Sequence, residues 1–140
     1  MAGNLYVEIV SPSGSIFRGE AGGVRAPGVE GSFEVLYNHA PMIAAFEIGP
    51  LFVTTPAGDR IGFATSGGFL EVLNNTVTVL AETAEPSTGI DLERARDAEQ
   101  RALQRLKAGG DAEERKRAAA ALERARNRAR VAMGSVGKRG

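Results

Sequence analysis

The amino-acid composition changes abruptly near residues 86–90, and this break divides the 140-residue chain into two parts. All eight aromatic residues and all six prolines lie at or before Pro86. Residues 1–90 carry three basic and nine acidic side chains, a net charge of −6. Residues 91–140 carry fourteen basic and eight acidic side chains, a net charge of +6. This asymmetry predicts two parts with different surfaces and different roles.

The first part, residues 1–86, has the pattern of short β-strands. Leu5, Val7 and Ile9 recur at every second position, which is typical of a half-buried strand. Further apolar runs lie at 33–36, 51–54, 61–64, 69–73 and 76–81. Turn-forming residues separate them at 12–14, 56–59, 66–68 and 74–75. The pattern predicts an antiparallel β-sandwich or barrel of about ten short strands.

The second part, residues 91–133, predicts an antiparallel hairpin of two helices, 91–107 and 111–133. Asp91 and Asp111 are suited to cap the two helix N-termini, and Gly109-Gly110 ends the first helix. We expect residues 87–90 to be a linker and residues 134–140, after the stop at Gly134, to be a flexible tail. The predicted fold class is therefore α+β in two parts.

The predicted contact faces of the two helices are mostly alanine. Alanine buries little apolar area, and each Å² contributes roughly 25 cal/mol, so the hairpin should dock weakly. A firm β-domain with a weakly docked hairpin suits a conformational switch, whose two arrangements differ by only a few kcal/mol.

The residues that carry chemistry in enzymes are sparse in this chain. His39 is the single histidine, there is no cysteine, and no phosphate-binding loop or dinucleotide fingerprint is present. No apolar run approaches the roughly 20 residues that span a bilayer. We therefore expect neither an active site nor a metal site, and any membrane association should be indirect.

Arginine is concentrated on the predicted hairpin. Arg94 and Arg101 share one helix face, and Arg124 and Arg128 share another. Most such arginines form a solvated surface. If the hairpin is antiparallel, these four guanidinium groups could also converge on a polyphosphate. Spacing alone leaves both interpretations open.

Several motifs together resemble the epsilon subunits of F-type rotary ATP synthases. The motifs are Val10-Ser11-Pro12, Gly31 to Pro41 with His39-Ala40-Pro41, Ser66-Gly67-Gly68-Phe69-Leu70-Glu71-Val72, Thr76 to Ala81, and Ile90-Asp91-Leu92-Glu93-Arg94-Ala95. The last is similar to the I/L-D-x-x-R-A motif of nucleotide-binding epsilon subunits, and the resemblance covers nearly the whole chain.

The resemblance implies a non-catalytic central-stalk subunit that couples the catalytic head to the rotor. Its β-sandwich would bind the gamma subunit and the c-ring, and its hairpin would switch from a compact to an extended state. The extended hairpin would contact the alpha/beta catalytic hexamer and inhibit ATP hydrolysis. The implied inhibitory contacts are Arg115, Lys116, Arg117, Arg126 and Arg130.

The resemblance also implies a regulatory ATP site, although no cofactor is required. ATP would brace the compact hairpin. The implied site residues are Glu85, Ile90, Asp91, Arg94, Arg101, Arg124 and Arg128, and each carries the residue type of the family's nucleotide-binding members.

One loop departs from the family pattern, which reads close to G-E-L-G-I-x-P-G-H-x-P. Ser32 stands in place of the usual glutamate, and Tyr37-Asn38 stands in place of Pro-Gly. Ser32, Tyr37, Asn38 and His39 are the residues that the resemblance assigns to the rotor contact, so the polar details of that contact should differ here.

Two other functions explain the basic hairpin less well. A nucleic-acid-binding protein would use the +6 part, but the −6 part would repel phosphate and the helices carry no aromatic residue to stack on bases. A passive coiled-coil scaffold would need apolar heptads that the helices lack. The N-terminus resembles neither a secretory signal nor a transit peptide. We therefore expect a peripheral protein at the cytoplasmic face of a bacterial inner membrane.

Overall fold

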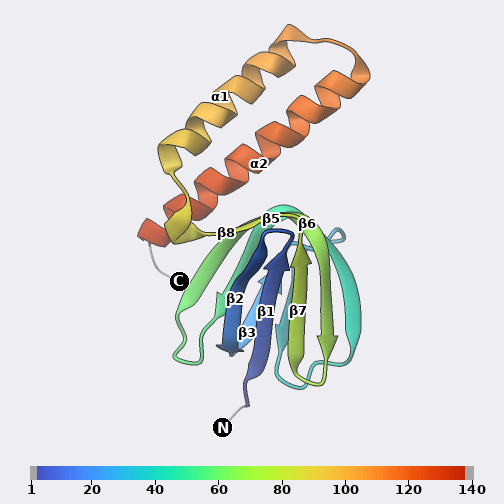
Figure 1. Ribbon diagram of the computed structural model, residues 1–140, viewed down its shortest axis with the longest axis vertical. Helices are drawn as coiled ribbons and strands as arrows, with labels where there is room; N and C mark the ends of the chain where they lie inside the picture. Colours follow the sequence, from blue (N-terminus) through green and yellow to red (C-terminus); the bar gives the residue numbers. More distant parts are fainter. Residues whose placement is uncertain (1–2, 138–140) are drawn as a thin grey trace.

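The structure, a computed structural model that describes residues 3–137, is a β-sandwich with a helical hairpin over one end (Figure 1). The N-terminus and the turn between β6 and β7 lie at the opposite end (Figure 1). The strands are β1 (Leu5–Ser11), β2 (Gly14–Ala21), β3 (Gly23–Ala26), β4 (Phe33–Leu36), β5 (Met42–Thr54), β6 (Arg60–Leu73), β7 (Thr76–Ala81) and β8 (Ala84–Pro86). A 3₁₀ turn, η1 (Ser87–Gly89), leads into helices α1 (Leu92–Ala108) and α2 (Ala112–Gly137).

The strands form one sheet in the order β2-β1-β7-β6-β5-β3-β4, and β8 pairs with β6. The β1–β7 pair is parallel, and the other pairs of named strands are antiparallel. The predicted fold class is confirmed. The described residues hold eight strands where about ten were predicted, and β6, 14 residues long, spans two of the predicted runs, 61–64 and 69–73.

The long strands β5 and β6 belong to both layers of the sandwich. The C-terminal half of β6 pairs with β7, whereas its N-terminal half pairs with β8. The change of layer falls at Gly67 and Gly68, whose φ angles are +111° and +152°. A Cβ on Gly68 would lie 2.0 Å from the Leu80 carbonyl oxygen. The prediction of a turn at 66–68 is therefore wrong: the glycines fold one continuous strand.

Between the layers lies the hydrophobic core. The side chains of Leu5, Val7 and Ile9 are fully buried, as their alternation predicts. Phe17 and Phe63 meet edge to face with their ring centroids 5.8 Å apart. The Asn74-Asn75 turn is also confirmed, with φ angles of +50° and +62° at its two central positions.

Both helices begin at the predicted aspartates. Asp91 Oδ1 accepts a hydrogen bond from the Arg94 amide at 3.1 Å. Asp111 and Glu114 form a reciprocal capping box, in which each side chain accepts from the other residue's amide at 2.8 and 2.9 Å. Gly109, at φ +84°, ends α1 as expected.

The second helix is longer than predicted. It continues through Gly134 to Gly137, so the prediction that residues 134–137 begin a flexible tail is wrong. A glycine inside a helix costs only about 1 kcal/mol, which packing of the preceding turns can offset. Residues 138–140 of the predicted tail lie outside the described part.

Small side chains join the two helices. Ala95 and Ala102 of α1 are buried, and so are the α2 residues Ala118, Leu122, Ala125 and Ala129. The hairpin therefore buries mostly methyl groups, as its sequence predicts, and it depends on the sandwich for further stabilisation.

We predict that Gly68→Ala destabilises the chain by several kcal/mol, because the new methyl group clashes with the backbone of β7 at a positive φ angle. Gly58→Ala is the matched control: its φ is +99°, but no atom lies within 4 Å of the added Cβ. Urea denaturation measures both. Equal losses in the two variants would contradict the account of the strand fold.

Candidate functional site

The C-terminal half of α2 joins the hairpin to the sandwich, and we call its contact with β5, β6 and β8 the junction. Val131 of α2 is buried there. A Cβ on Gly62 of β6 would lie 3.6 Å from Val131 Cγ1, so the valine packs close to bare backbone. Val131 therefore packs against the β6 backbone at Gly62.

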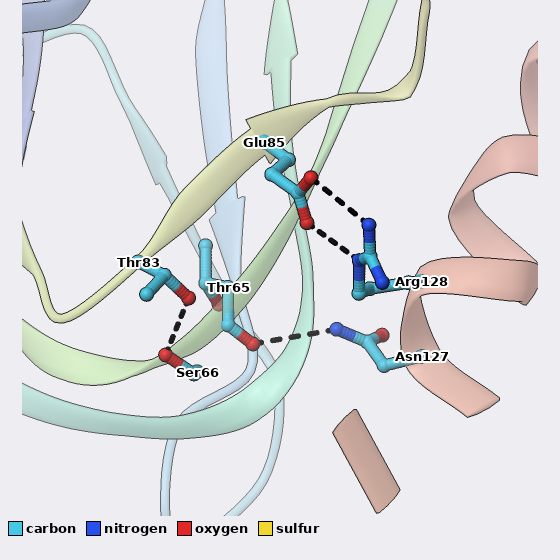
Figure 2. Close-up of polar contacts among 6 residues, drawn as sticks. All are labelled: Thr65, Ser66, Thr83, Glu85, Asn127 and Arg128. Atoms are coloured by element: carbon cyan, nitrogen blue, oxygen red, sulfur yellow. Dashed lines mark hydrogen bonds and ion pairs between the residues drawn. The ribbon is translucent and has the colours of Figure 1, made fainter. Parts of the chain in front are cut away.

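Beside this valine, a polar contact is completely buried. Asn127 is 1% exposed, and its Nδ2 donates to the Thr65 carbonyl oxygen at 3.3 Å (Figure 2). Asn127 Oδ1 is buried and has no hydrogen-bond partner among the described residues. An unpaired buried acceptor costs roughly 1–3 kcal/mol, which is recovered if the group becomes hydrated. The described residues therefore pair one of the two polar atoms of the Asn127 side chain.

An ion pair lies at the edge of the junction. Arg128 Nε and Nη2 donate to the two carboxylate oxygens of Glu85 at 2.7 and 3.2 Å (Figure 2). Glu85 lies on β8 and Arg128 on α2, so this bidentate pair ties the hairpin directly to the sandwich. Both side chains are about one-third exposed, and water weakens the attraction accordingly.

A cavity of about 630 Å³ lies next to this ion pair, between sandwich and hairpin. Its hairpin wall consists of Ala98 on α1 and Ala121, Arg124, Ala125 and Arg128 on α2. Its sandwich wall consists of Ser11–Ser13, in the β1–β2 connection, and residues 82–85. The volume is typical of pockets that hold small organic ligands.

Five of the seven residues that the resemblance assigned to ATP lie at or beside this cavity. Glu85, Arg124 and Arg128 line it directly. Arg94 and Arg101 do not, but they lie one helical turn on either side of Ala98, which does. Within residues 3–137, the guanidinium groups of Arg94, Arg101 and Arg124 form no side-chain hydrogen bond or ion pair.

The other two assigned residues have local structural roles. Asp91 caps α1, and the Ile90 amide donates to the Ser87 carbonyl oxygen at 3.4 Å. Neither residue lines the cavity.

The five basic residues assigned to inhibition are exposed, but three of them already have partners. Arg126 bridges to Glu99 of α1 at 3.1 Å. Arg117 lies 3.8 Å from Glu113, and Arg115 donates to the Gly110 carbonyl oxygen at 2.6 Å. Neither Lys116 nor Arg130 makes a side-chain hydrogen bond or ion pair in the part of the chain that the structure describes.

The residues that the resemblance assigned to the rotor contact lie at the two ends of β4, and their role stays a prediction. Strand β4 separates Ser32 from Tyr37, Asn38 and His39 by about 13 Å, at 3.3 Å per residue. Asn38 instead contacts the β6–β7 turn, where its amide donates to Asn75 Oδ1 at 2.6 Å. His39 Nδ1 lies 2.8 Å from the Ala40 carbonyl oxygen.

An exposed apolar surface was missed by the sequence analysis. It extends across β1, β5, β6 and β7, and we call it the outer face: Tyr6, Ile43, Phe69, Leu73 and Leu80. Phe69 pairs with Leu80, and the two side chains are 58% and 55% exposed. The available signal was that Phe69-Leu70 and Val79-Leu80 are apolar on both faces of their strands, although only one face is in the core.

Among the described residues, no three His, Cys, Asp or Glu side chains form a group that could hold a metal ion. None of the helices that they form is long and apolar enough to span a bilayer.

Two family models together match most of the chain. The first, ATP synthase, Delta/Epsilon chain, beta-sandwich domain, matches residues 4–87. The second, ATP synthase, Delta/Epsilon chain, long alpha-helix domain, matches residues 89–133.

Curated relatives and solved structures agree with these models. An ATP synthase epsilon chain from Salinibacter ruber is 61% identical over 99% of both chains. Another from Desulfitobacterium hafniense is 47% identical over 76% of this chain and 80% of that one. A chain in the Euglena gracilis mitochondrial ATP synthase shares the fold, with a TM-score of 0.77 at 23% identity, over 86% of this chain and 76% of that chain. The chain therefore belongs to the delta/epsilon chain family of the ATP synthases.

Proposed function

We propose that the chain works as a non-catalytic central-stalk subunit whose helical hairpin docks reversibly on the β-sandwich and, when released, inhibits ATP hydrolysis by the catalytic head. The observation that carries this proposal is the junction. It contains a partly exposed ion pair, a buried valine next to Gly62, and a buried amide whose oxygen has no hydrogen-bond partner among the described residues. Such a contact is stable enough to form and weak enough to exchange, as a two-state element requires.

ATP is the proposed regulatory ligand of the docked state. The cavity between sandwich and hairpin has a suitable volume, and Arg124 and Arg128 supply guanidinium groups for phosphates. Arg94 and Arg101 would need only side-chain rotation, because Ala98 between them already lines the cavity. A ligand held there contacts both bodies and so favours the docked arrangement over the released one.

The released hairpin is proposed to contact the alpha/beta catalytic hexamer. Residues 91–140 carry a net charge of +6, which would attract the hairpin to an acidic surface. The exposed Lys116 and Arg130 are free for such a contact in the docked state, so far as residues 3–137 show. Arg126 must first leave Glu99.

The sandwich is proposed to bind the gamma subunit through the outer face. This face carries five large exposed apolar side chains, with Glu8 and Glu71 between them, and partner surfaces commonly cover such side chains. We propose that the c-ring contact uses the opposite end from the hairpin, where His39 and the β6–β7 turn lie. These contacts would hold the chain peripherally at the cytoplasmic face of a bacterial inner membrane.

Nucleic-acid binding is the second candidate and is less well supported. Four hairpin arginines already bond to neighbouring groups, which leaves fewer guanidinium groups for a polyanion: Arg115, Arg117, Arg126 and Arg128. The acidic first part would in addition repel a polyanion.

We predict that Phe69→Glu weakens binding of the gamma subunit roughly thirtyfold or more, because it replaces the exposed ring that pairs with Leu80 on the outer face by a charge. Val29→Glu is the matched control, since Val29 is 55% exposed but lies outside this surface. Biolayer interferometry on immobilised gamma subunit measures both. Equal effects of the two variants would contradict the assignment of the face.

We also predict that Val131→Ala increases inhibition of ATP hydrolysis. Removing two carbons from the junction weakens docking by about 1.5 kcal/mol, roughly a tenfold shift toward the released hairpin. ATP hydrolysis by the reconstituted catalytic head with gamma and this chain is the measurement, and Val29→Ala is the control. If hydrogen exchange shows a looser α2 in Val131→Ala but inhibition is unchanged, release of the hairpin does not cause inhibition.

A further inference from the structure

The sandwich wall of the cavity presents a serine pair in the connection between β1 and β2. Ser11 is 8% exposed, and its Oγ lies 2.9 Å from Ser13 Oγ. The Ser13 amide donates to Ser11 Oγ at 3.3 Å. Pro12 between them has a fixed φ angle and no amide hydrogen, so the segment has few alternative conformations.

This arrangement leaves one hydroxyl hydrogen without a partner. Either hydroxyl can donate in this contact, because the Ser11 oxygen that accepts the Ser13 amide keeps a second lone pair. When Ser11 donates, the hydroxyl hydrogen of Ser13 is free to donate elsewhere. Ser13 is exposed and lines the same cavity as Arg124 and Arg128, so an acceptor-rich ligand there can receive it.

A hydrogen-bond donor on the sandwich wall of the cavity would make the affinity for phosphate differ between the docked and the released hairpin. Arg94, Arg101, Arg124 and Arg128 all lie on the hairpin, and guanidinium groups that move with the helices could bind phosphate in either state. A ligand with equal affinity for both states shifts neither. Glu85 belongs to the sandwich, but its carboxylate repels phosphate. A neutral hydrogen-bond donor on the sandwich wall of the cavity would make binding tighter in the docked state.

We infer that Ser13 donates a hydrogen bond to a phosphate group of the nucleotide, and that Ser11 holds Ser13 in position. This contact makes ATP binding specific to the docked hairpin. This inference rests on the ATP site proposed above. It adds the β1–β2 connection to a site whose other proposed residues all lie between Glu85 and Arg128 in the sequence.

Calorimetric titration of the full chain with ATP tests the inference. We expect Ser13→Ala to weaken ATP binding about tenfold, because a hydrogen bond to a charged group is lost. Ser13→Thr keeps the hydroxyl and should bind nearly as the parent does. Ser15→Ala is the matched control, since Ser15 is also exposed but does not line the cavity. Arg124→Ala reports on the proposed ATP site itself.

The variants also distinguish a failure of the proposed ATP site from a failure of the proposed role of Ser13. If Arg124→Ala loses binding while Ser13→Ala binds like the parent, the ATP site stands and the role of Ser13 is wrong. If the parent binds no ATP at millimolar concentration, both are wrong. Hydrogen exchange of α2 gives a second readout: ATP should slow exchange in the parent and in Ser13→Thr, and much less in Ser13→Ala at the same fractional saturation.

Discussion

Helix α2 packs against both α1 and the β-sandwich, and the rest of the structure depends on this double contact. One side of the helix buries alanines and Leu122 against α1, and another side places Asn127 and Val131 on β5 and β6. Small residues allow both contacts but supply little apolar area to either. The hairpin is therefore held to the sandwich by a few identifiable side chains, whose loss or gain can move the docking equilibrium.

The way in which α2 contacts the sandwich also determines where the cavity lies. Because α2 contacts the sandwich mainly through its C-terminal half, a space remains between the hairpin and the serine turn that follows β1. Its two walls belong to different bodies and exist together only when the hairpin is docked. If a ligand binds in this space as proposed, its binding and the docking of the hairpin would be coupled, and each would favour the other.

Local sequence patterns predicted the elements well, and long-range packing explains what they missed. Alternation identified β1, and the two aspartates identified the helix starts, because these signals act within a few residues. Gly67-Gly68 suggests a turn in isolation, and only pairing with β7 makes it a fold inside a strand. Asn127 gave no signal at all, since its burial depends on where α2 meets Thr65. The arginine spacing identified Arg124 and Arg128 on the hairpin wall of the cavity. Only the tertiary structure brings Ser11 and Ser13 to the opposite wall.

The central claim is that ATP controls docking of the hairpin, and a distance measurement tests it most directly. The chain has no cysteine, so spin labels can be attached uniquely at Ala57→Cys in the sandwich and Lys116→Cys in α2, both of which are exposed. Pulsed electron–electron double resonance would be recorded on the subunit in its assembled synthase. The account predicts one distance population in saturating ATP, matching the docked hairpin, and a second population that grows as ATP is removed. A distribution that does not change with ATP would contradict it.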